Sequence, residues 1–172
     1  MAEEKTNVMR VLEQKKIPYT PHSYPHTEGE AVDGATVAAL LGRDPGEVYK
    51  TLVTRGASKA NYVFVVPVLA ELDLKKAAKT VGEKSIELIH VKELTPLTGY
   101  VRGGCSPIGM KKRFKTVVDA SAFSDSEDAR GMFVTPRDID ASVRDISKLI
   151  GYAINLALHD GLTVEDIDLL VS

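Results

Sequence analysis

The stretch VYKTLVTRGASKANYVFVVPV, residues 48–68, is the part of the chain from which the rest of the fold can be worked out. Two runs rich in β-branched and aromatic residues, Val48–Thr54 and Tyr62–Val68, flank the polar stretch GASKAN. Such residues favour extended backbone, and a short polar stretch with a glycine between two such runs is typical of a β-hairpin. The pattern therefore predicts an antiparallel pair of strands.

Helical periodicity appears on both sides of this hairpin. Glu3–Lys16 predicts an amphipathic helix, and Thr36 is expected to cap a short helix that ends at Gly42. Asp73 is expected to cap a helix that ends at Gly82. Shorter patterns predict a strand at Ser85–His90, a helical turn at Val91–Leu94 broken by Thr95-Pro96, and strands at Thr116–Val118 and Met132–Thr135.

The carboxyl-terminal part has apolar residues at helical spacing from about Asp138 to Leu158, which predicts a long helix. The chain shows no internal repeat and no regular alternation of strand and helix. We therefore expect an α/β chain of the mixed α+β kind, built as a single domain over residues 1–172 on a mixed sheet, with a helical segment from about residue 138.

Composition narrows the class of protein. The 172 residues, 44% hydrophobic and 27% charged, are ordinary for one soluble domain. No apolar run approaches the roughly 18 residues of a membrane span, and the charged start MAEEKTNVMR lacks a secretory signal, so a cytoplasmic protein is expected. The single cysteine, Cys105, excludes an internal disulfide and a thiolate-rich zinc site. We expect neither metal nor cofactor.

The charge pattern limits how nucleic acid could be bound. A net charge of −2 does not suit a protein that grips nucleic acid with its whole surface, so any RNA binding must be local. Taken alone, each basic cluster is more typical of a solvated face. The clusters are Lys75, Lys76, Lys79 and Lys84, and then Lys111, Lys112, Arg113 and Lys115.

The segment GYVRGGCSPIGMKK, residues 99–112, is the most informative for chemistry. Its glycines allow backbone N–H groups to approach an ester oxyanion or a phosphate closely, although spacing alone supports a tight turn without a ligand equally well. It is not a nucleotide-binding P-loop, because Met110 stands where that motif requires lysine.

Conventional hydrolase and metal motifs are missing from the sequence. There is no GxSxG elbow, and Ser106 has no sequence-evident His and Asp to activate it. Cys105 beside glycines is more typical of a small packing residue than of a nucleophile. His22 and His26 are four residues apart, but no HExxH motif follows, so a zinc site is not expected.

Three motifs in order resemble the YbaK/EbsC family of trans-acting aminoacyl-tRNA deacylases. VYKTLV at Val48–Val53 is similar to its Lys-Thr-Leu strand, LDLKKAAK at Leu72–Lys79 to its helix, and GYVRGGCSPIGMKK to its glycine loop. The opening IPYTPHSYPH is similar too. The resemblance covers most of residues 8–119 and implies a barrel-like mixed sheet flanked by helices, also found as an editing domain of some prolyl-tRNA synthetases.

The resemblance implies roles for particular residues. The essential lysine falls on Lys50, and the loop that contributes backbone groups to catalysis falls on Gly103 and Gly104. The implied reaction is deacylation of mischarged tRNA, cysteinyl-tRNA(Pro) above all, in a transient complex with prolyl-tRNA synthetase. The implied substrate-binding residues are Tyr24, Thr51, Ser106, Pro107 and Asp138, the last in a Pro-x-Asp that the family shares.

Two alternatives stay open at this point. Lys50 lies in an apolar strand pattern, which favours a lysine facing a cleft; an edge-strand lysine that prevents aggregation is the secondary alternative. The chain could also be a non-catalytic adaptor of the same fold that binds tRNA or a synthetase. Either function would use the tRNA-binding lysines that we expect, Lys75, Lys76, Lys79, Lys111 and Lys112.

Overall fold

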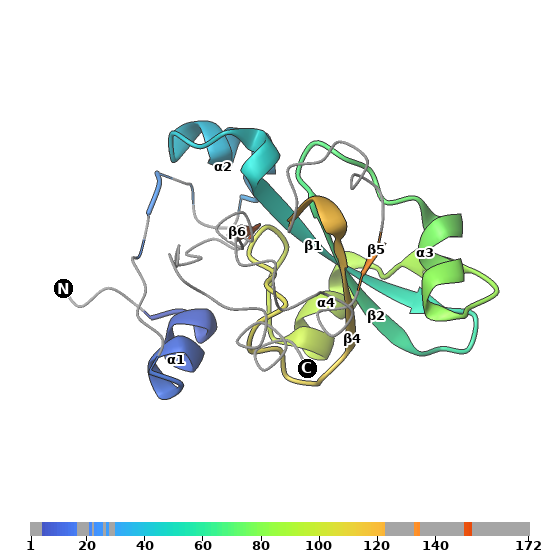
Figure 1. Cartoon of the computed structure of the whole chain (residues 1–172). Helices are drawn as coiled ribbons and strands as arrows, with labels where there is room; N and C mark the ends of the chain where they lie inside the picture. Colours follow the sequence, from blue (N-terminus) through green and yellow to red (C-terminus); the bar gives the residue numbers. More distant parts are fainter. Residues whose placement is uncertain are drawn as a thin grey trace.

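One mixed β-sheet organises the chain in the computed structural model (Figure 1). The structure describes residues 5–16, 21, 23–25, 27, 30–122, 133–134 and 150–152. The described strands follow the order β3-β1-β2-β4-β5, and β6 pairs with β1. Their bounds are β1 Val48–Gly56, β2 Asn61–Pro67, β3 Ile86–Leu88, β4 Lys115–Asp119, β5 Phe133–Val134 and β6 Ile150–Tyr152.

The predicted hairpin forms the centre of this sheet. Strands β1 and β2 pair antiparallel, with Tyr49 opposite Pro67 and Arg55 opposite Asn61 at the two ends of the register. On either side, β3 joins β1 antiparallel and β4 joins β2 parallel. The mixed sheet is thus confirmed, but the path from β3 to β5 is open at both ends, so the described strands do not close into a barrel.

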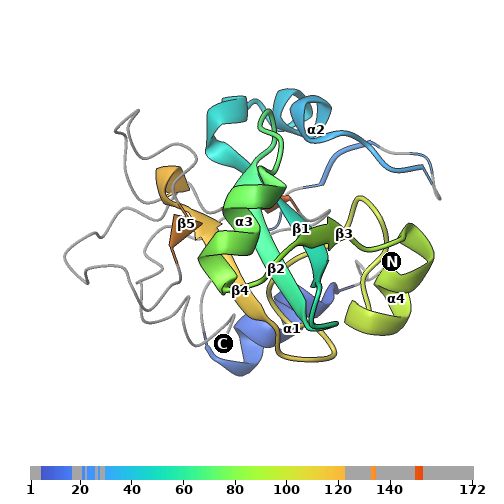
Figure 2. The ribbon, with the colours of Figure 1, turned by 90° about the vertical axis from the view of Figure 1, so that its right-hand side faces the viewer.

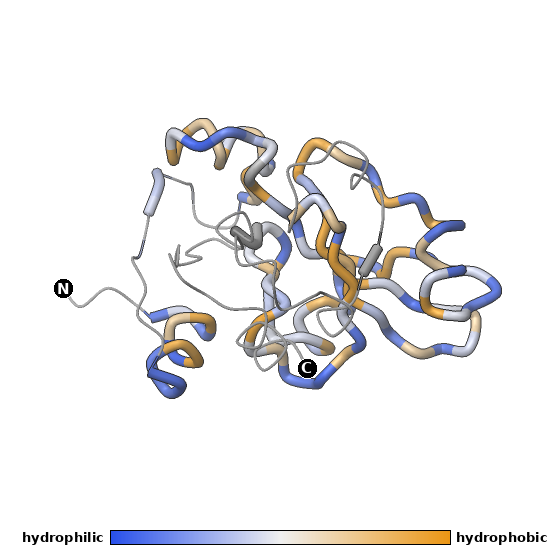
Figure 3. The backbone as a smooth tube through the Cα atoms, in the orientation of Figure 1, coloured by the Kyte–Doolittle hydropathy of each residue, from blue (hydrophilic) through white to orange (hydrophobic). Residues whose placement is uncertain are grey.

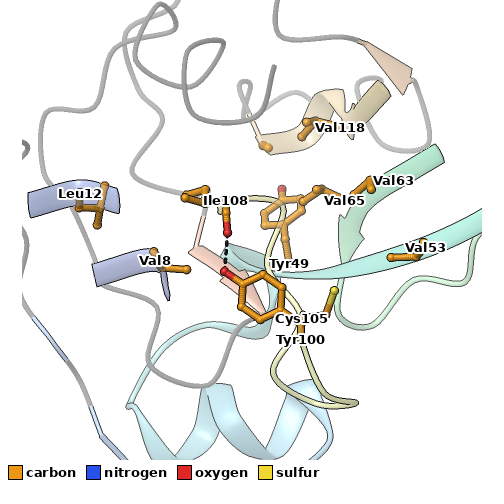
Figure 4. Packing of buried hydrophobic residues seen from close by; sticks show 11 residues of the cluster. Val8, Leu12, Tyr49, Val53, Val63, Val65, Tyr100, Cys105, Ile108 and Val118 are labelled. Atoms are coloured by element: carbon orange, nitrogen blue, oxygen red, sulfur yellow. Dashed lines mark hydrogen bonds between the residues drawn. The ribbon is translucent and has the colours of Figure 1, made fainter. Parts of the chain in front are cut away.

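Alternation along the strands gives the sheet two apolar faces. On one face Tyr49 and Val53 pack with residues of α1 Asn7–Gln14, α4 Val91–Thr98 and the glycine loop (Figure 4). On the other face Phe64 packs with Ala77 and Ala78 of α3 Leu74–Val81. Figure 2 shows α3 lying across its face of the sheet. Figure 3 shows apolar residues along the central strands and a mixture of apolar and hydrophilic residues along α3.

The helices begin and end largely where the sequence predicts. Asp73 caps α3 by accepting the Lys76 N–H at 3.0 Å, and Gly82 ends it with a φ of +74°, a conformation that glycine adopts without strain. Helix α2, Gly34–Leu40, is capped by Asp33 and not by Thr36. The prediction of Thr36 is wrong because Asp33, three residues earlier, accepts both the N–H and the hydroxyl of Thr36.

Helix α4 corrects the expected break at Pro96. The helix runs through Pro96 to Thr98, and Gly99 ends it with a φ of +83°. Proline removes one backbone donor from a helix, which normally destabilises it. Here Leu94 and Leu97 pack on the core and the Thr98 hydroxyl donates to the Leu94 carbonyl at 2.7 Å, so tertiary packing offsets the loss.

The carboxyl-terminal helix is contradicted where the structure describes it. Residues Ile150–Tyr152 form β6, which pairs parallel with Val48–Lys50 of β1. Isoleucine and tyrosine favour strands, and the edge of β1 offers backbone partners that a local periodicity does not reveal. The other residues of the predicted helix, 138–149 and 153–158, lie outside the described residues. The single domain over residues 1–172 stays a prediction.

The cap at Asp73 can be tested by a stability measurement. Asp73→Ala is expected to lower the free energy of unfolding by about 1 kcal/mol, because the Lys76 N–H loses its acceptor. Urea denaturation followed by circular dichroism would measure this change. Exposed Glu71, just before the helix, provides the control, and an equal loss in Glu71→Ala would contradict the role of the cap.

Candidate active site

A cavity of about 470 Å³ opens at the edge of β1. This volume is within the range of small-molecule binding sites. Four segments that are distant in sequence form the wall: residues before α2, the middle of β1, the β3–α4 connection and the glycine loop. The lining residues are Ala31, Val32, Asp33, Lys50, Thr51, Leu52, Val53, Leu88, Ile89, His90, Val91, Leu94, Arg102, Gly103 and Cys105.

The cavity lies where the edge of β1 has a gap between its partners. Strand β6 pairs with Val48–Lys50, and β3 pairs with Thr54–Gly56. The Val53 carbonyl accepts the Ile89 N–H at 3.2 Å, so the backbone groups of Val53 face the edge shared by β3 and β6. Alternate residues of a strand point their backbone groups to the same edge, so those of Thr51 face this edge as well. The backbone of Thr51 therefore points toward the cavity.

Lys50 and Thr51 both line the cavity. Lys50 is half-buried, and no residue in the described part of the chain makes an ion pair with it. The Thr51 side chain is only 8% exposed, and its hydroxyl has no hydrogen-bond partner among the described residues. A buried polar group without a partner costs folding free energy, and such groups concentrate at functional sites. The pair therefore combines a cation that makes no described ion pair with a hydroxyl that has no described hydrogen-bond partner.

The glycine loop closes the cavity through a tight turn at Val101–Gly104. The Gly104 N–H donates to the Val101 carbonyl at 3.0 Å, and Gly103 has a φ of +82°, as in a type II turn. The Gly104 N–H is thus occupied, and Gly104 does not line the cavity. Gly103 does line it, and no described residue accepts its N–H, so Gly103 is the better placed of the two predicted donors.

Gly103 also packs tightly against the opposite wall. A Cβ atom at this position would lie 3.0 Å from the Ala31 Cβ and 3.2 Å from the Ala31 Cα. The positive φ favours glycine, and the close contact makes any side chain at this position strained. A bulky residue at Gly103 would therefore displace this wall as well as fill part of the cavity.

Ser106 and Pro107 support the loop from behind. Both are buried and neither lines the cavity. The Ser106 hydroxyl accepts the Ile108 N–H at 3.2 Å, and the Tyr100 hydroxyl donates to the Ile108 carbonyl (Figure 4). Burial raises the pKa of Tyr100 far above its usual value, so it stays a neutral donor. Ser106 and Pro107 are therefore placed to support the loop that carries Gly103.

Other predicted site residues lie away from the cavity or outside the described residues. Tyr24 is buried but does not line the cavity, and Asp138 is outside the described residues. The expected tRNA-binding lysines lie apart: α3, with Lys75, Lys76 and Lys79, covers the Phe64 face of the sheet, whereas Lys111 and Lys112 follow the loop on the Tyr49 face. The structure does not join them into one rim.

Sequence reasoning missed several wall residues. Asp33, His90 and Arg102 bring charged or titratable groups to the cavity. His90 ends the predicted strand before α4, and Arg102 directly precedes Gly103, so each occupies a position where polar side chains often serve a site. Spacing alone could not show that residues 31–33 lie opposite the loop.

An ion pair fixes the start of α4 at the cavity. Arg55 of β1 donates to Glu93 at 2.8 Å, and the second oxygen of Glu93 accepts the His90 N–H at 3.2 Å. The Arg55 hydrogen bond holds the pKa of the Glu93 carboxyl below its usual value, so the pair remains charged at neutral pH. The wall formed by α4 is thereby tied to the strand that carries Lys50.

Cys105 is part of the cavity floor. It is 5% exposed, and burial raises the pKa of its thiol to about 12. Because the thiolate is the nucleophilic form, a thiol that stays protonated at neutral pH is a poor nucleophile. This agrees with the interpretation of Cys105 as a packing residue.

Within the described part of the chain, no group of three or more His, Cys, Asp or Glu side chains is arranged to hold a metal ion. In the same residues, no helix has the length and apolar character needed to cross a membrane.

Comparison with known proteins identifies the class. Residues 28–149 match the model of the aminoacyl-tRNA editing domain. A relative from Enterococcus faecalis, EbsC, is 47% identical over 120 residues, which are 70% of this chain and 73% of EbsC; its name proposes a Cys-tRNA(Pro)/Cys-tRNA(Cys) deacylase. The chain belongs to the aminoacyl-tRNA editing domain family, and the resemblance to the YbaK/EbsC family is confirmed.

Solved structures show the same fold. A crystal structure of a protein proposed as a trans-editing enzyme for prolyl-tRNA synthetase matches with a TM-score of 0.59 and 24% identity, over 79% of this chain and 90% of the other. A crystal structure of a hypothetical protein matches with a TM-score of 0.61 and 19% identity, over 88% of this chain and 100% of the other. At such identities the likeness concerns the fold alone.

The hydroxyl of Thr51, which has no partner among the described residues, is expected to contribute nothing to stability. Thr51→Val keeps the side-chain shape and removes a buried group that has no partner among the described residues, so the free energy of unfolding should stay the same or rise by about 1 kcal/mol. Chemical denaturation would measure it. A clear loss of stability would show that the hydroxyl has a structural partner and is not held in reserve for a ligand.

Cys105 is expected to resist alkylation in the folded protein. With a pKa of about 12, little thiolate exists near pH 8, and burial blocks the reagent. Mass spectrometry after treatment with iodoacetamide should show slow labelling of the native chain and rapid labelling in urea. Equal rates in both states would mean that the thiol is accessible and reactive.

Proposed function

We propose that the chain hydrolyses the ester of mischarged aminoacyl-tRNA, with cysteinyl-tRNA(Pro) as its main substrate. The observation that carries this proposal is the cavity that brings Lys50, Thr51 and Gly103 together at the open edge of β1. Membership of the editing-domain family and the proposed activity of EbsC support the same substrate class.

In this proposal the cavity wall positions the ester and polarises its carbonyl. The N–H of Gly103 donates to the carbonyl oxygen as negative charge develops there, an arrangement that often supplies the largest share of catalysis in acyl transfer. Lys50 contacts the polar groups of the substrate from β1. The Thr51 hydroxyl, buried and without a described partner, donates to or accepts from the aminoacyl group.

The nucleophile in this proposal is the substrate itself. The cysteinyl thiol sulfur bonds to its own carbonyl carbon, the ester bond breaks, and the ribose oxygen leaves with a proton; water then opens the resulting thiolactone. Proximity favours such an intramolecular attack. Neither the thiol nor the hydroxyl on the described wall is a better nucleophile, because the Cys105 thiol has a raised pKa and no described base contacts the Thr51 hydroxyl.

Binding of the tRNA body is assigned to lysines outside the cavity. Lys75, Lys76 and Lys79 on α3, and Lys111 and Lys112 after the loop, are exposed and can contact phosphates. Since phosphate contacts carry no sequence information, we propose that selectivity for tRNA(Pro) comes from prolyl-tRNA synthetase in a transient complex, formed in the cytoplasm.

Substitution of Lys50 distinguishes an enzyme from an adaptor. Lys50→Ala is expected to lower deacylation of cysteinyl-tRNA(Pro) at least a hundredfold with little change in stability, because a half-buried strand lysine at a cavity contributes little packing. Release of labelled cysteine over time measures the rate.

Lys59→Ala, at an exposed lysine in the turn between β1 and β2, is the matched control and should keep full activity. Full activity in Lys50→Ala would remove Lys50 from the mechanism. Absence of deacylation in the unaltered protein, with tRNA binding retained, would favour the adaptor.

A further inference from the structure

The guanidinium of Arg102 brings a positive charge to the cavity, and it has no role in the fold or in the proposed chemistry described above. Arg102 lines the cavity and is exposed, whereas Thr51 and Cys105 on the same wall are buried. Thr51 and Cys105 therefore lie at the floor of the cavity, and Arg102 lies at its mouth. No hydrogen bond or ion pair within the described part of the chain engages the Arg102 side chain.

Two carboxylates at or beside the cavity, Asp33 and Glu93, are engaged by other groups. Among the described wall residues Asp33 is the only carboxylate, and its two oxygens accept the N–H and the hydroxyl of Thr36 at 3.0 and 2.6 Å. Glu93, at the start of α4, pairs with Arg55. Together with Lys50, Arg102 gives the wall a net positive charge, which favours an anionic ligand.

Apolar side chains at the mouth add a second recognition element. Leu88 is 52% exposed and Val91 is 59% exposed, and both line the cavity. Single exposed apolar residues need no explanation, but two at the mouth of one cavity form a surface that can cover the flat face of a nucleobase.

We propose that Arg102 binds the phosphodiester that joins the terminal nucleoside of the substrate to the acceptor strand, while Leu88 and Val91 contact its base. This inference rests on the proposed function. In aminoacyl-tRNA the reacting ester and this phosphate sit on the same ribose. Gly103 contacts the ester in the proposed mechanism, and Arg102 is the adjacent residue toward solvent, so the phosphate reaches the guanidinium when the ester is in place. Arginine suits this role because its planar donors match a phosphate in a bidentate manner.

The test compares substrates with and without this phosphate. Arg102→Gln is assayed on cysteinyl-tRNA, on the 3′-cysteinyl ester of adenosine 5′-monophosphate, and on the 3′-cysteinyl ester of adenosine. We expect KM to rise about tenfold on the first two, the effect of losing one charge-assisted hydrogen bond, with kcat unchanged. On the adenosine ester, variant and unaltered protein should behave alike. The dependence of KM on salt should weaken by about one phosphate contact.

Arg43→Gln is the matched control, because Arg43 is an exposed arginine that does not line the cavity. It should behave as the unaltered protein on all three substrates. An unchanged KM on cysteinyl-tRNA in Arg102→Gln, or an equal rise on the adenosine ester, would overturn the proposal.

A binding measurement separates this site from the deacylation itself. Titration of the dinucleotide CpA, followed by NMR, needs no turnover. Binding weakened in Arg102→Gln but not in Arg43→Gln supports the phosphate site even if no ester is hydrolysed, in which case only the proposed function fails. Equal CpA binding by all three proteins, with turnover intact, rejects the phosphate site alone.

Discussion

Strand β1 pairs with three other strands, and the cavity exists because these pairings leave part of one edge open. Strand β2 takes one edge along nearly its whole length, while β3 and β6 divide the other edge between them. Backbone groups that face a gap must find water or a ligand, because a buried unpaired amide is costly. At this gap the buried hydroxyl of Thr51 also has no partner among the described residues, so the cavity offers a polar group to a ligand.

The glycine loop shows how a single position can serve structure and site together. Gly103 turns the chain with a positive φ and lets the backbone approach Ala31 from the segment before α2. The same residue lines the cavity, and no described residue accepts its N–H. Behind it, Ser106 and Tyr100 hold Ile108 through two hydrogen bonds, so the loop rests on the core and not on its ligand. A preorganised donor of this kind loses no free energy to rearrangement when the substrate binds.

Local features of the sequence predicted the elements, and tertiary contacts decided the rest. The hairpin was predictable from the strand propensities of neighbouring residues. Helix α3 was predictable from its caps and its periodicity, which also depend only on residues close in sequence. Strand β6 was not, because Ile150–Tyr152 takes its conformation from the edge of β1, and Pro96 stays helical because the core holds α4.

The same division holds for the site. Lys50 and Gly103 were expected from motifs, and both line the cavity. Arg102, His90 and Asp33 were not expected there, because the order of the strands brings their segments together. Ser106 was expected at the substrate, but it is buried, does not line the cavity, and its hydroxyl accepts the Ile108 N–H.

The burial of Cys105 bears on redox chemistry at the cavity floor. In the proposed function the cavity receives a cysteinyl group, which would bring a second thiol close to the sulfur of Cys105. An exposed thiolate at this position would exchange with disulfides and form mixed adducts. Exchange requires the thiolate of the attacking group and access to the sulfur. With a pKa of about 12 and 5% exposure, Cys105 has neither, so oxidants and disulfides in the surrounding solution should leave the floor of the cavity intact.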